Sequence, residues 1–377
     1  MSEIDILSDE QRMIRESAEG FVAKDSGIDR VRKWRWQAPG FDRAVWRTMV
    51  SNGWLGLTWP EAHGGLGMGL GSLGALVEVL GSGLVPEPLI AASVLGAGSI
   101  VHGDNQALQQ SLLPRIANGE VIPALAWQEG PDGLECRPAT RAESKGGVIL
   151  LRGTKTHVPA AGGADGFVVS AWDGVGVGLY WVERGAAGLS MDLAKRVDGG
   201  FYGTLTFDGV TVEPGGCVAS AKTGEAVLAR VLDEARLMAS ASLLGNMSKA
   251  LEISLEYMRN RVQFDKPIGS FQALQHRAVD LYVQQELSRS AVMAATQVFE
   301  STTDARARAV AASQAKARCS DAGLRITREC IQIHGGIGYT DECNIGLYLK
   351  RAMVEASWLG NASAHRRRYA ALNPAAA

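Results

Sequence analysis

The feature that most constrains this chain is the helical character of its C-terminal part, which begins at Gly224. Alanine, leucine, arginine and glutamate dominate this part, and these are good helix formers. We expect four long helices in succession, at about residues 226–261, 271–301, 304–334 and 344–371. Such a series predicts an antiparallel four-helix bundle. A bundle of this size leaves an outer face free, which we expect to serve as an oligomer interface.

Two segments of different character precede the bundle. From a capping box formed by Ser8 and Gln11 to about residue 118, apolar residues recur at helical spacing around a glycine-rich loop. After this, short β-like runs are separated by glycine and not by long helices, which predicts an antiparallel sandwich or barrel. The predicted fold is therefore mainly α with a β-domain. It comprises an N-terminal helical domain (1–118), a middle β-domain (119–222) and a C-terminal four-helix bundle (223–377).

Charge and cysteine usage exclude several classes of function. The net charge of −2 gives no positive field for nucleic acid or an anionic membrane, and the basic cluster from His365 to Arg368 is expected to be a solvated helix end. The five cysteines lack C-x-x-C spacing and the six histidines lack metal-ligand spacing, so we expect no disulfide framework and no metal. The chain has no signal-peptide pattern and no run of about 18 apolar residues, so we expect a cytoplasmic protein without a membrane span.

Two motifs at helix junctions have the chemistry of a dinucleotide site. One reads R-V-Q-F-D-K-P-I-G-S-F-Q from Arg261, and the other reads Q-I-H-G-G-I-G-Y from Gln332. Arg261 can donate two parallel hydrogen bonds to a pyrophosphate, and Phe264 offers an apolar wall to an adenosine. The glycines let the backbone approach phosphate oxygens closely. The candidate cofactor contacts in these motifs are Arg261, Phe264, Phe271, Gln272, Gln332, Gly335 and Gly336.

The order of blocks and the motifs at their junctions resemble the acyl-CoA dehydrogenase family over essentially the whole chain. Residues 60–65 are similar to the family's P-E-x-x-G-G loop, and the two junction motifs to its R-x-x-F-G-x-x-I-x-x-F-Q and Q-x-x-G-G-x-G-[YF] segments. The resemblance implies FAD as cofactor, with the C-terminal motifs contacting the ADP portion of an FAD held by the neighbouring subunit. It also implies an acyl-CoA substrate, with Arg236 and Tyr339 as candidate contacts, and an electron-transfer flavoprotein or another electron acceptor as partner.

The resemblance further implies a base that takes a proton from the carbon next to the thioester while hydride leaves the next carbon for the flavin. Most members carry this base as a glutamate before a glycine in the last bundle helix, where this chain has Leu359, which cannot accept a proton. Others place it on the first bundle helix before an arginine, where this chain has Ala235. Glu234 stands one residue early, about 100° around a helix, so it is either a base in a shifted register or an exposed helix carboxylate. Asp341 and Glu342 are weaker candidates.

The flavin-ring contacts that the resemblance implies are incomplete. Where the family has a W-[IST]-[TS] strand, this chain reads Thr156-His-Val-Pro-Ala, and Pro159 lacks both a hydroxyl and a backbone N–H. The preceding family segment appears only partly, as Trp127-Gln-Glu-Gly-Pro-Asp-Gly. Gln128 and His157 are therefore the candidate polar side chains for the flavin edge.

The chain thus combines complete motifs for ADP with a missing base. In this combination it resembles the smaller or companion subunits of heteromeric acyl-CoA dehydrogenases. Our first hypothesis is a subunit of such an oligomer, homomeric or paired with a paralogous chain, with an atypical or partner-supplied base. The alternatives are a self-sufficient homomeric dehydrogenase that uses Glu234, a flavin-dependent oxygenase or oxidase on the same fold, and a non-catalytic companion subunit. The sequence does not identify the acyl group.

Overall fold

The computed structural model describes residues 7–130, 134 and 137–373, whose contacts divide the chain into two compact units. Unit 1 comprises Met1–Val31, Leu70–Val85 and Arg236–Ala377. Unit 2 comprises Arg32–Gly69 and Pro86–Ala235. Each unit combines segments that are far apart in sequence. The boundaries of the three predicted domains, at residues 118 and 222, stay a prediction.

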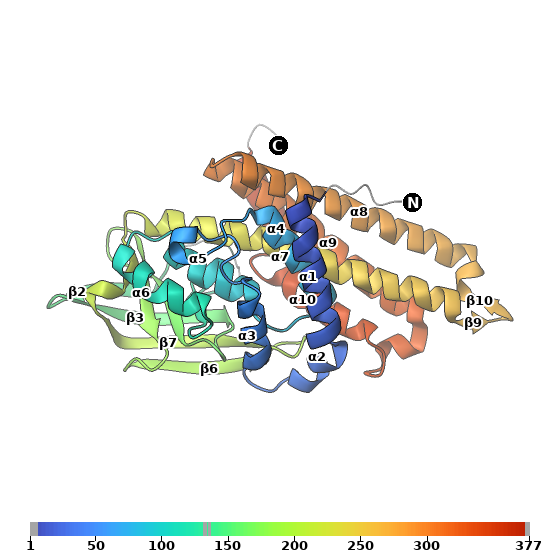
Figure 1. Cartoon of the computed structure of the whole chain (residues 1–377), viewed down its shortest axis with the longest axis horizontal. Helices are drawn as coiled ribbons and strands as arrows, with labels where there is room; N and C mark the ends of the chain where they lie inside the picture. The colour runs from blue at the N-terminus through green and yellow to red at the C-terminus, as the bar shows by residue number, and fades with distance from the viewer. Residues whose placement is uncertain (1–6, 131–133, 135–136, 374–377) are drawn as a thin grey trace. The chain divides into compact units, whose positions relative to one another are not determined.

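Unit 1 consists mainly of helices, the longest of them in its C-terminal segment (Figure 1). Its helices are α1 (Asp9–Asp25), the start of α2 (Ile28–Trp34), α4 (Leu70–Ser82), α7 (Gly224–Asn260) from Arg236 on, α8 (Gln272–Ser301), α9 (Ala305–His334), α10 (Ile345–Ser357) and α11 (Ala362–Leu372). The turns contain β9 (Val262–Gln263), β10 (Lys266–Pro267) and the 3-10 helices η4 (Ile268–Ser270) and η5 (Gly335–Tyr339). The predicted helical character of the C-terminal region is confirmed.

Local sequence signals explain where two of these helices begin. The Ser8 hydroxyl accepts the N–H of Gln11, and the Gln11 side chain accepts the N–H of Ser8, so the predicted capping box starts α1. The last predicted helix is instead two helices. Leu359 and Gly360 have φ values of 62° and 104°, and the Asn361 side chain then caps α11. The chain turns between α10 and α11 because left-handed residues cannot continue an α-helix.

Helices α4 and α7 approach each other closely within unit 1, and glycines permit this contact. A Cβ on Gly245 of α7 would lie 1.8 Å from the backbone oxygen of Glu78 in α4. A Cβ on Gly81 of α4 would lie 2.3 Å from the backbone oxygen of Ser242 in α7. A larger residue at either position would force the two helices apart.

Unit 2 contains the sheet and several shorter helices. Its helical elements are α3 (Arg43–Ser51), η1 (Glu61–His63), the π-helix η2 (Ile90–Ala97), α5 (Gly98–Val101), α6 (Gln106–Ala117), η3 (Pro214–Gly216) and the start of α7. Its strands are β1 (Pro123–Ala126), β2 (Arg141–Lys145), β3 (Val148–Pro159), β4 (Gly166–Trp172), β5 (Val177–Glu183), β6 (Leu189–Lys195), β7 (Phe201–Val212) and β8 (Cys217–Ala219). The short β-like runs expected between residues 119 and 222 appear as strands of this unit.

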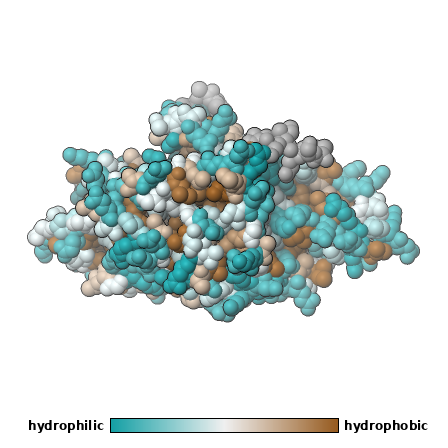
Figure 2. Space-filling model, viewed as in Figure 1, coloured by the Kyte–Doolittle hydropathy of each residue, from teal (hydrophilic) through white to brown (hydrophobic). Residues whose placement is uncertain are grey.

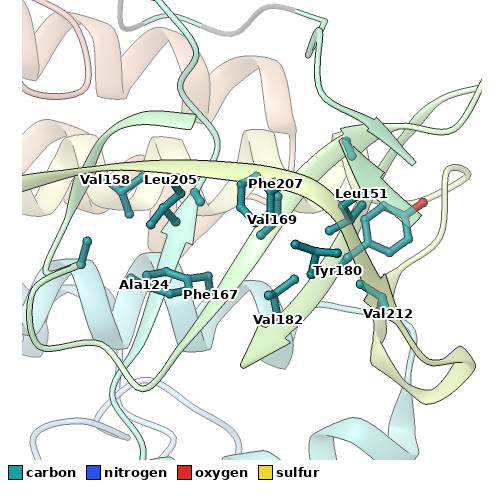
Figure 3. Close-up of a cluster of buried hydrophobic side chains, with 14 of the residues drawn as sticks. Ala124, Leu151, Val158, Phe167, Val169, Tyr180, Val182, Leu205, Phe207 and Val212 are labelled. Atoms are coloured by element: carbon teal, nitrogen blue, oxygen red, sulfur yellow. The ribbon is translucent and has the colours of Figure 1, made fainter. Parts of the chain in front are cut away.

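The strands form one sheet in the order β6-β7-β3-β2-β4-β5-β8, with β1 also paired to β4. Most pairs are antiparallel as predicted, but β4 pairs in parallel with both β1 and β2. Phe167 of β4, Tyr180 and Val182 of β5, and Leu205 and Phe207 of β7 point into one core (Figure 3). Since β5 and β7 lie apart in the strand order and still share this core, the sheet folds over on itself, as in the predicted sandwich or barrel.

Hydrophilic residues predominate on the face of the molecule shown in Figure 2, and hydrophobic residues form small patches among them. Within the described ranges, no helix combines the length and the apolar character needed to cross a membrane.

Candidate functional site

Two turns predicted to bind a nucleotide lie at the same end of unit 1. One follows α7 and contains β9 and β10, and the other follows α9 and contains η5 (Figure 1). Tyr257, in the last turn of α7, stacks on His334, the last residue of α9, with ring centroids 4.4 Å apart and an interplanar angle of 22°. The Tyr257 hydroxyl also lies 3.5 Å from the His334 carbonyl oxygen. These contacts place the two sequence motifs next to each other.

The first turn presents an aromatic side chain to solvent. Phe264 and Asp265 at the tip of the β9–β10 hairpin have φ values of 55° and 61°, the conformation of a tight hairpin turn. Phe264 is 85% exposed and meets the edge of Phe271 at 6.1 Å between centroids, while the Lys266 ammonium lies 4.4 Å from the Phe271 ring. Arg261 is exposed at the base of this turn. Phe264, Arg261 and Lys266 are therefore exposed at this turn and are not part of the buried core of unit 1.

The second turn combines an exposed backbone with a tightly packed glycine. Gly335 has φ 66° and ψ −143°, which side chains other than glycine disfavour, and a Cβ on Gly336 would meet nothing within 4 Å. A Cβ on Gly338, in contrast, would lie 2.8 Å from the carbonyl oxygen of Ile331. Tyr339 is 82% exposed. Within η5, the backbone at Gly336 is therefore open to a ligand, whereas the backbone at Gly338 packs closely against the end of α9.

Gln128 and His157, the candidate flavin-ring contacts, lie close together in unit 2. The Thr156 N–H donates to the Gln128 carbonyl oxygen at 2.7 Å, and the Gln128 side chain donates to the Gly130 carbonyl oxygen. A register shift between β3 and β7 at residues 155–158 turns His157 outward with φ 53°. Pro131, Asp132 and Gly133 of the partly matching segment lie outside the described residues.

A buried ion pair that the sequence analysis missed supports this region. The Lys155 ammonium, fully buried in the β-domain, lies 2.6 Å from Glu129 Oε1 and 3.0 Å from Ser170 Oγ. Burial opposes ionisation of Glu129, but the charge of Lys155 and the N–H of Thr140 hold the pKa of its carboxyl below the ordinary value. The pair joins the segment after β1 to strand β3, next to Gln128. No sequence signal marks it, since lysine in a strand usually faces solvent.

Glu234 is buried, so its interpretation as an exposed helix carboxylate was wrong. Its side chain accepts a hydrogen bond from Arg230 Nε at 3.0 Å and lies 3.7 Å from His102 Nε2. Burial opposes ionisation of Glu234, but His102 and Arg230 outweigh it and hold its pKa below the ordinary value. The carboxylate is therefore ionised, and within unit 2 it already pairs with Arg230 and lies beside His102.

Leu359 lies in the turn between α10 and α11, and buried side chains hold its carbonyl oxygen. Arg236 Nε donates to this oxygen at 3.3 Å, and His365 Nε2 lies 3.0 Å from it. Both side chains are fully buried. His365 is therefore not part of a solvated helix end, as the sequence analysis expected, whereas Arg366 and Arg367 are exposed. Burial lowers the pKa of His365 to about 3, so the imidazole is neutral and Nε2 carries its proton.

Lys316 of α9 supports the same turn. Its ammonium lies 2.9, 3.3 and 3.1 Å from the carbonyl oxygens of Glu355, Ala356 and Gly360. Burial lowers the pKa of Lys316 to about 7. Glu355 in turn accepts a hydrogen bond from the Ser242 hydroxyl at 2.8 Å. Sequence reasoning missed this cluster because the burial of Lys316 depends on helices far away in the chain.

Two further predictions concern carboxylates and metal binding. Asp341 and Glu342 are exposed in the segment after η5. Over the described part of the chain, no group of three histidine, cysteine, aspartate or glutamate side chains is placed to hold a metal ion. Cys217, Cys319, Cys330 and Cys343 are free thiols, and Cys136 lies outside the described residues.

Comparisons with known proteins point to one family. Residues 8–120 match the model of the acyl-CoA dehydrogenase N-terminal domain, and residues 222–371 match that of the acyl-CoA dehydrogenase C-terminal domain. Acyl-CoA dehydrogenase IpdE2 of Mycolicibacterium smegmatis is 29% identical over 94% of this chain and 96% of its own. Acyl-CoA dehydrogenase FadE27 of Mycobacterium tuberculosis is 30% identical over 87% of each chain.

Solved structures give the same result. A chain from a variant of the Tcur3481-Tcur3483 steroid ACAD has a TM-score of 0.87 and 32% identity, and the match covers 98% of this chain and 99% of that one. A chain of the ChsE4-ChsE5 complex from Mycobacterium tuberculosis has a TM-score of 0.89 and 25% identity over the full length of both.

Proposed function

This chain belongs to the acyl-CoA dehydrogenase family of flavoprotein oxidoreductases, whose cofactor is FAD, and we propose that it acts as one subunit of a heteromeric member. In this proposal the assembly desaturates an acyl-CoA thioester between its α and β carbons, and a paralogous subunit supplies the base. Two similar structures support it, because the name of each gives a pair of chains, and one of them is called a steroid enzyme. A steroid-derived acyl-CoA is accordingly the first substrate class to test.

The end of unit 1 suits the ADP portion of an FAD held mainly by a neighbouring subunit. Arg261, Gln272 and Gln332 are exposed and carry hydrogen-bond donors for a diphosphate. The open backbone at Gly336 lets phosphate oxygens approach amide groups. Phe264, with Phe271 at its edge, offers an apolar surface for the adenosine. The remaining contacts in this proposal are Gly335 for the diphosphate and Tyr339 for the acyl-CoA.

This chain has fewer hydrogen-bonding groups for the edge of the flavin ring than for the ADP portion. Gln128 and His157 would contact the ring edge of a flavin held by this chain itself, since Gln128 bonds to Thr156 of β3 and the neighbouring His157 is exposed. When bound, the flavin supplies the hydride acceptor of the reaction. Pro159 offers it no backbone N–H, which leaves this chain with few donors for the ring. Arg236 is fully buried, so we propose that it supports the Leu359 turn and affects the substrate through that turn.

The absence of a carboxylate at residue 359 is the main support for a base supplied by the partner subunit. Leu359 is apolar and buried, and its turn is nevertheless held by Arg236, Lys316 and His365. A chain that worked alone through this position would need a proton acceptor there. We therefore place the base of the reaction in the partner subunit.

Glu234 is the candidate if this chain supplies a base of its own. It is a buried and ionised carboxylate two residues before Arg236, but Arg230 already pairs with it and His102 lies 3.7 Å away. Glu234→Gln removes the charge and keeps the shape. If the homomeric alternative holds, this variant loses at least about 100-fold in turnover while retaining its flavin. Unchanged turnover eliminates Glu234 as the base.

An exposed apolar stripe on α8 supports an oligomeric state. The exposed hydrophobic side chains along this helix are Val279, Tyr282, Val283, Leu287 and Met293. Their spacing places them on one side of the helix, and such a surface is typical of a subunit interface. Co-purification decides whether this interface pairs identical or paralogous chains.

The same co-purification tests the proposed function. The chain is expressed alone and together with a paralogous acyl-CoA dehydrogenase, and each preparation is mixed anaerobically with butyryl-CoA, octanoyl-CoA and a steroid-side-chain CoA thioester. We expect bleaching of the flavin absorbance by at least one thioester only in the co-purified complex. Full bleaching and turnover by the lone chain would reject the heteromeric proposal.

A further inference from the structure

One pair of rings connects both candidate ADP-binding turns. Tyr257 belongs to the first turn through its backbone, because its carbonyl oxygen accepts the N–H of Arg261 at 2.8 Å. It belongs to the second turn through its side chain, which stacks on His334. The first turn is closed in addition by the Ile268 N–H, which donates to the Arg261 carbonyl oxygen at 2.8 Å. A displacement of the Tyr257 ring would therefore move the two turns relative to each other.

His334 has a fixed position at the end of α9. Its Nδ1 lies 2.8 Å from the Cys330 carbonyl oxygen, so the ring donates a hydrogen bond there, and the side chain is buried. Gly338 of η5 packs back against it, since a Cβ on Gly338 would lie 3.1 Å from the His334 Cβ. His334 is thus held by α9 and packs against η5. It stands directly before Gly335, whose positive φ turns the chain.

A salt bridge ties the same end of the bundle together at a second point. Arg277 of α8 lies 3.1 Å from Glu329 of α9, and both side chains are more than a third exposed. A pair so exposed contributes little to stability. The stacked and largely buried rings of Tyr257 and His334 are the stronger connection between the turns.

We propose that Tyr257 and His334 are positioning residues which set the spacing of the two ADP-binding turns and thereby the retention of FAD. The inference rests on the proposed function, which assigns these turns to the ADP portion of the cofactor. Neither ring has to touch the nucleotide for this effect. A ligand that bridges two turns loses affinity when their spacing varies, because it must then restrict that motion on binding.

The first measurement needs no cofactor. Amide hydrogen exchange is compared between the wild-type chain and Tyr257→Leu, which removes the ring and keeps an apolar side chain. We expect exchange at residues 262–266 and 335–340 to rise together by at least about ten-fold, while the middle of α9 stays protected. Tyr257→Phe keeps the stacking and should behave as the wild type does.

The second measurement is a double-mutant cycle on flavin release. Tyr257→Leu, His334→Leu and the double variant are each co-purified with the paralogous subunit, and the fluorescence of released FAD is followed after dilution. We expect each single variant to release flavin at least about ten-fold faster, which corresponds to about 1.4 kcal/mol. The double variant should release flavin little faster than either single variant, because one change alone already removes the ring stacking. His334→Phe, which restores a ring, should recover slow release.

The outcomes separate this inference from the proposed function. Unchanged exchange in both turns of Tyr257→Leu, or additive effects in the cycle, would overturn the positioning role and leave the proposed function standing. Absence of flavin from every preparation, including the wild-type complex, would refute the proposed function. In that case the exchange experiment still decides whether Tyr257 couples the two turns.

Discussion

Lys155 and Lys316 each carry an ammonium group that is fully buried, one in each unit. Their surroundings differ. Lys155 has a carboxylate partner, Glu129, whereas Lys316 lies chiefly among backbone carbonyl oxygens. Burial of a charge is costly unless it is compensated, so each lysine indicates a place where the fold holds one particular geometry. For Lys155 this is the segment that carries Gln128, and for Lys316 it is the turn that carries Leu359.

Replacement of Lys155 tests the role of the buried pair in the β-domain. Lys155→Met leaves the Glu129 carboxylate without its cation, so the free energy of unfolding should fall by about 3–5 kcal/mol in urea denaturation. The matched control is Arg152→Met, which breaks the exposed pair with Asp208 on the same strand. That change should cost about 0–1 kcal/mol. Similar losses for both variants would show that the burial of Lys155 has no special effect.

The pH dependence of stability tests the environment of Lys316. Its pKa is about 7 in the folded chain against an ordinary value of 10.5, so between these pH values the unfolded chain binds more protons than the folded one. This difference makes the free energy of unfolding rise as the pH increases from about 7 to about 10, and the contribution is lost as the pH falls through 7. Lys316→Met should show a smaller rise, measured as urea midpoints at several pH values. An identical slope in both proteins would contradict the assignment.

At the scale of the elements, local signals predict much of the fold and the tertiary contacts explain the rest. The capping box at Ser8 starts α1 as expected. Gly360 and Asn361 are a helix stop and a helix start, so the sequence marks the break between α10 and α11, although the good helix formers around it favour one continuous helix. The parallel pairings of β4 and the burial of Lys316 could not be predicted, because both depend on contacts between distant segments.

The close contact between α4 and α7 yields a prediction about helix packing. Gly245→Ala would place a Cβ 1.8 Å from the Glu78 backbone oxygen, and a backbone atom cannot move aside as a flexible side chain can. The free energy of unfolding should fall by about 1–3 kcal/mol or more. The control is Gly20→Ala in α1, where a Cβ meets nothing within 4 Å and the helix should gain up to about 1 kcal/mol. A neutral Gly245→Ala would show that the two helices separate without cost.

At the scale of the whole molecule, the proposed ADP-side residues contribute little to the fold of a single chain, as expected of residues that serve an assembly. Phe264 and Tyr339 are both more than four-fifths exposed, and the Gly336 backbone is open. Family membership was predictable because the two helix-junction motifs are contiguous in sequence. The partner subunit and the acyl group were not, because they depend on surfaces formed by several elements.

Phe264→Ala separates assembly from folding. The side chain is 85% exposed, so the free energy of unfolding should change by no more than about 0.5 kcal/mol. The flavin content of the complex should nevertheless fall severalfold after gel filtration, because the adenosine loses its apolar wall. Val175→Ala, at a position 84% exposed between β4 and β5, is the control and should change neither property. Equal flavin content in all three proteins would remove Phe264 from the site.

In the proposed assembly this chain completes an FAD site located mainly on a paralogous subunit. This proposal is tested most directly by the flavin content per chain, from the visible absorbance and the protein concentration, for the lone chain and for the co-purified complex. We expect almost no flavin in the lone chain and about one FAD per pair of unlike chains in the complex, with loss of that flavin on Arg261→Met. One FAD per chain in the lone protein, with dehydrogenation of an acyl-CoA, would contradict it.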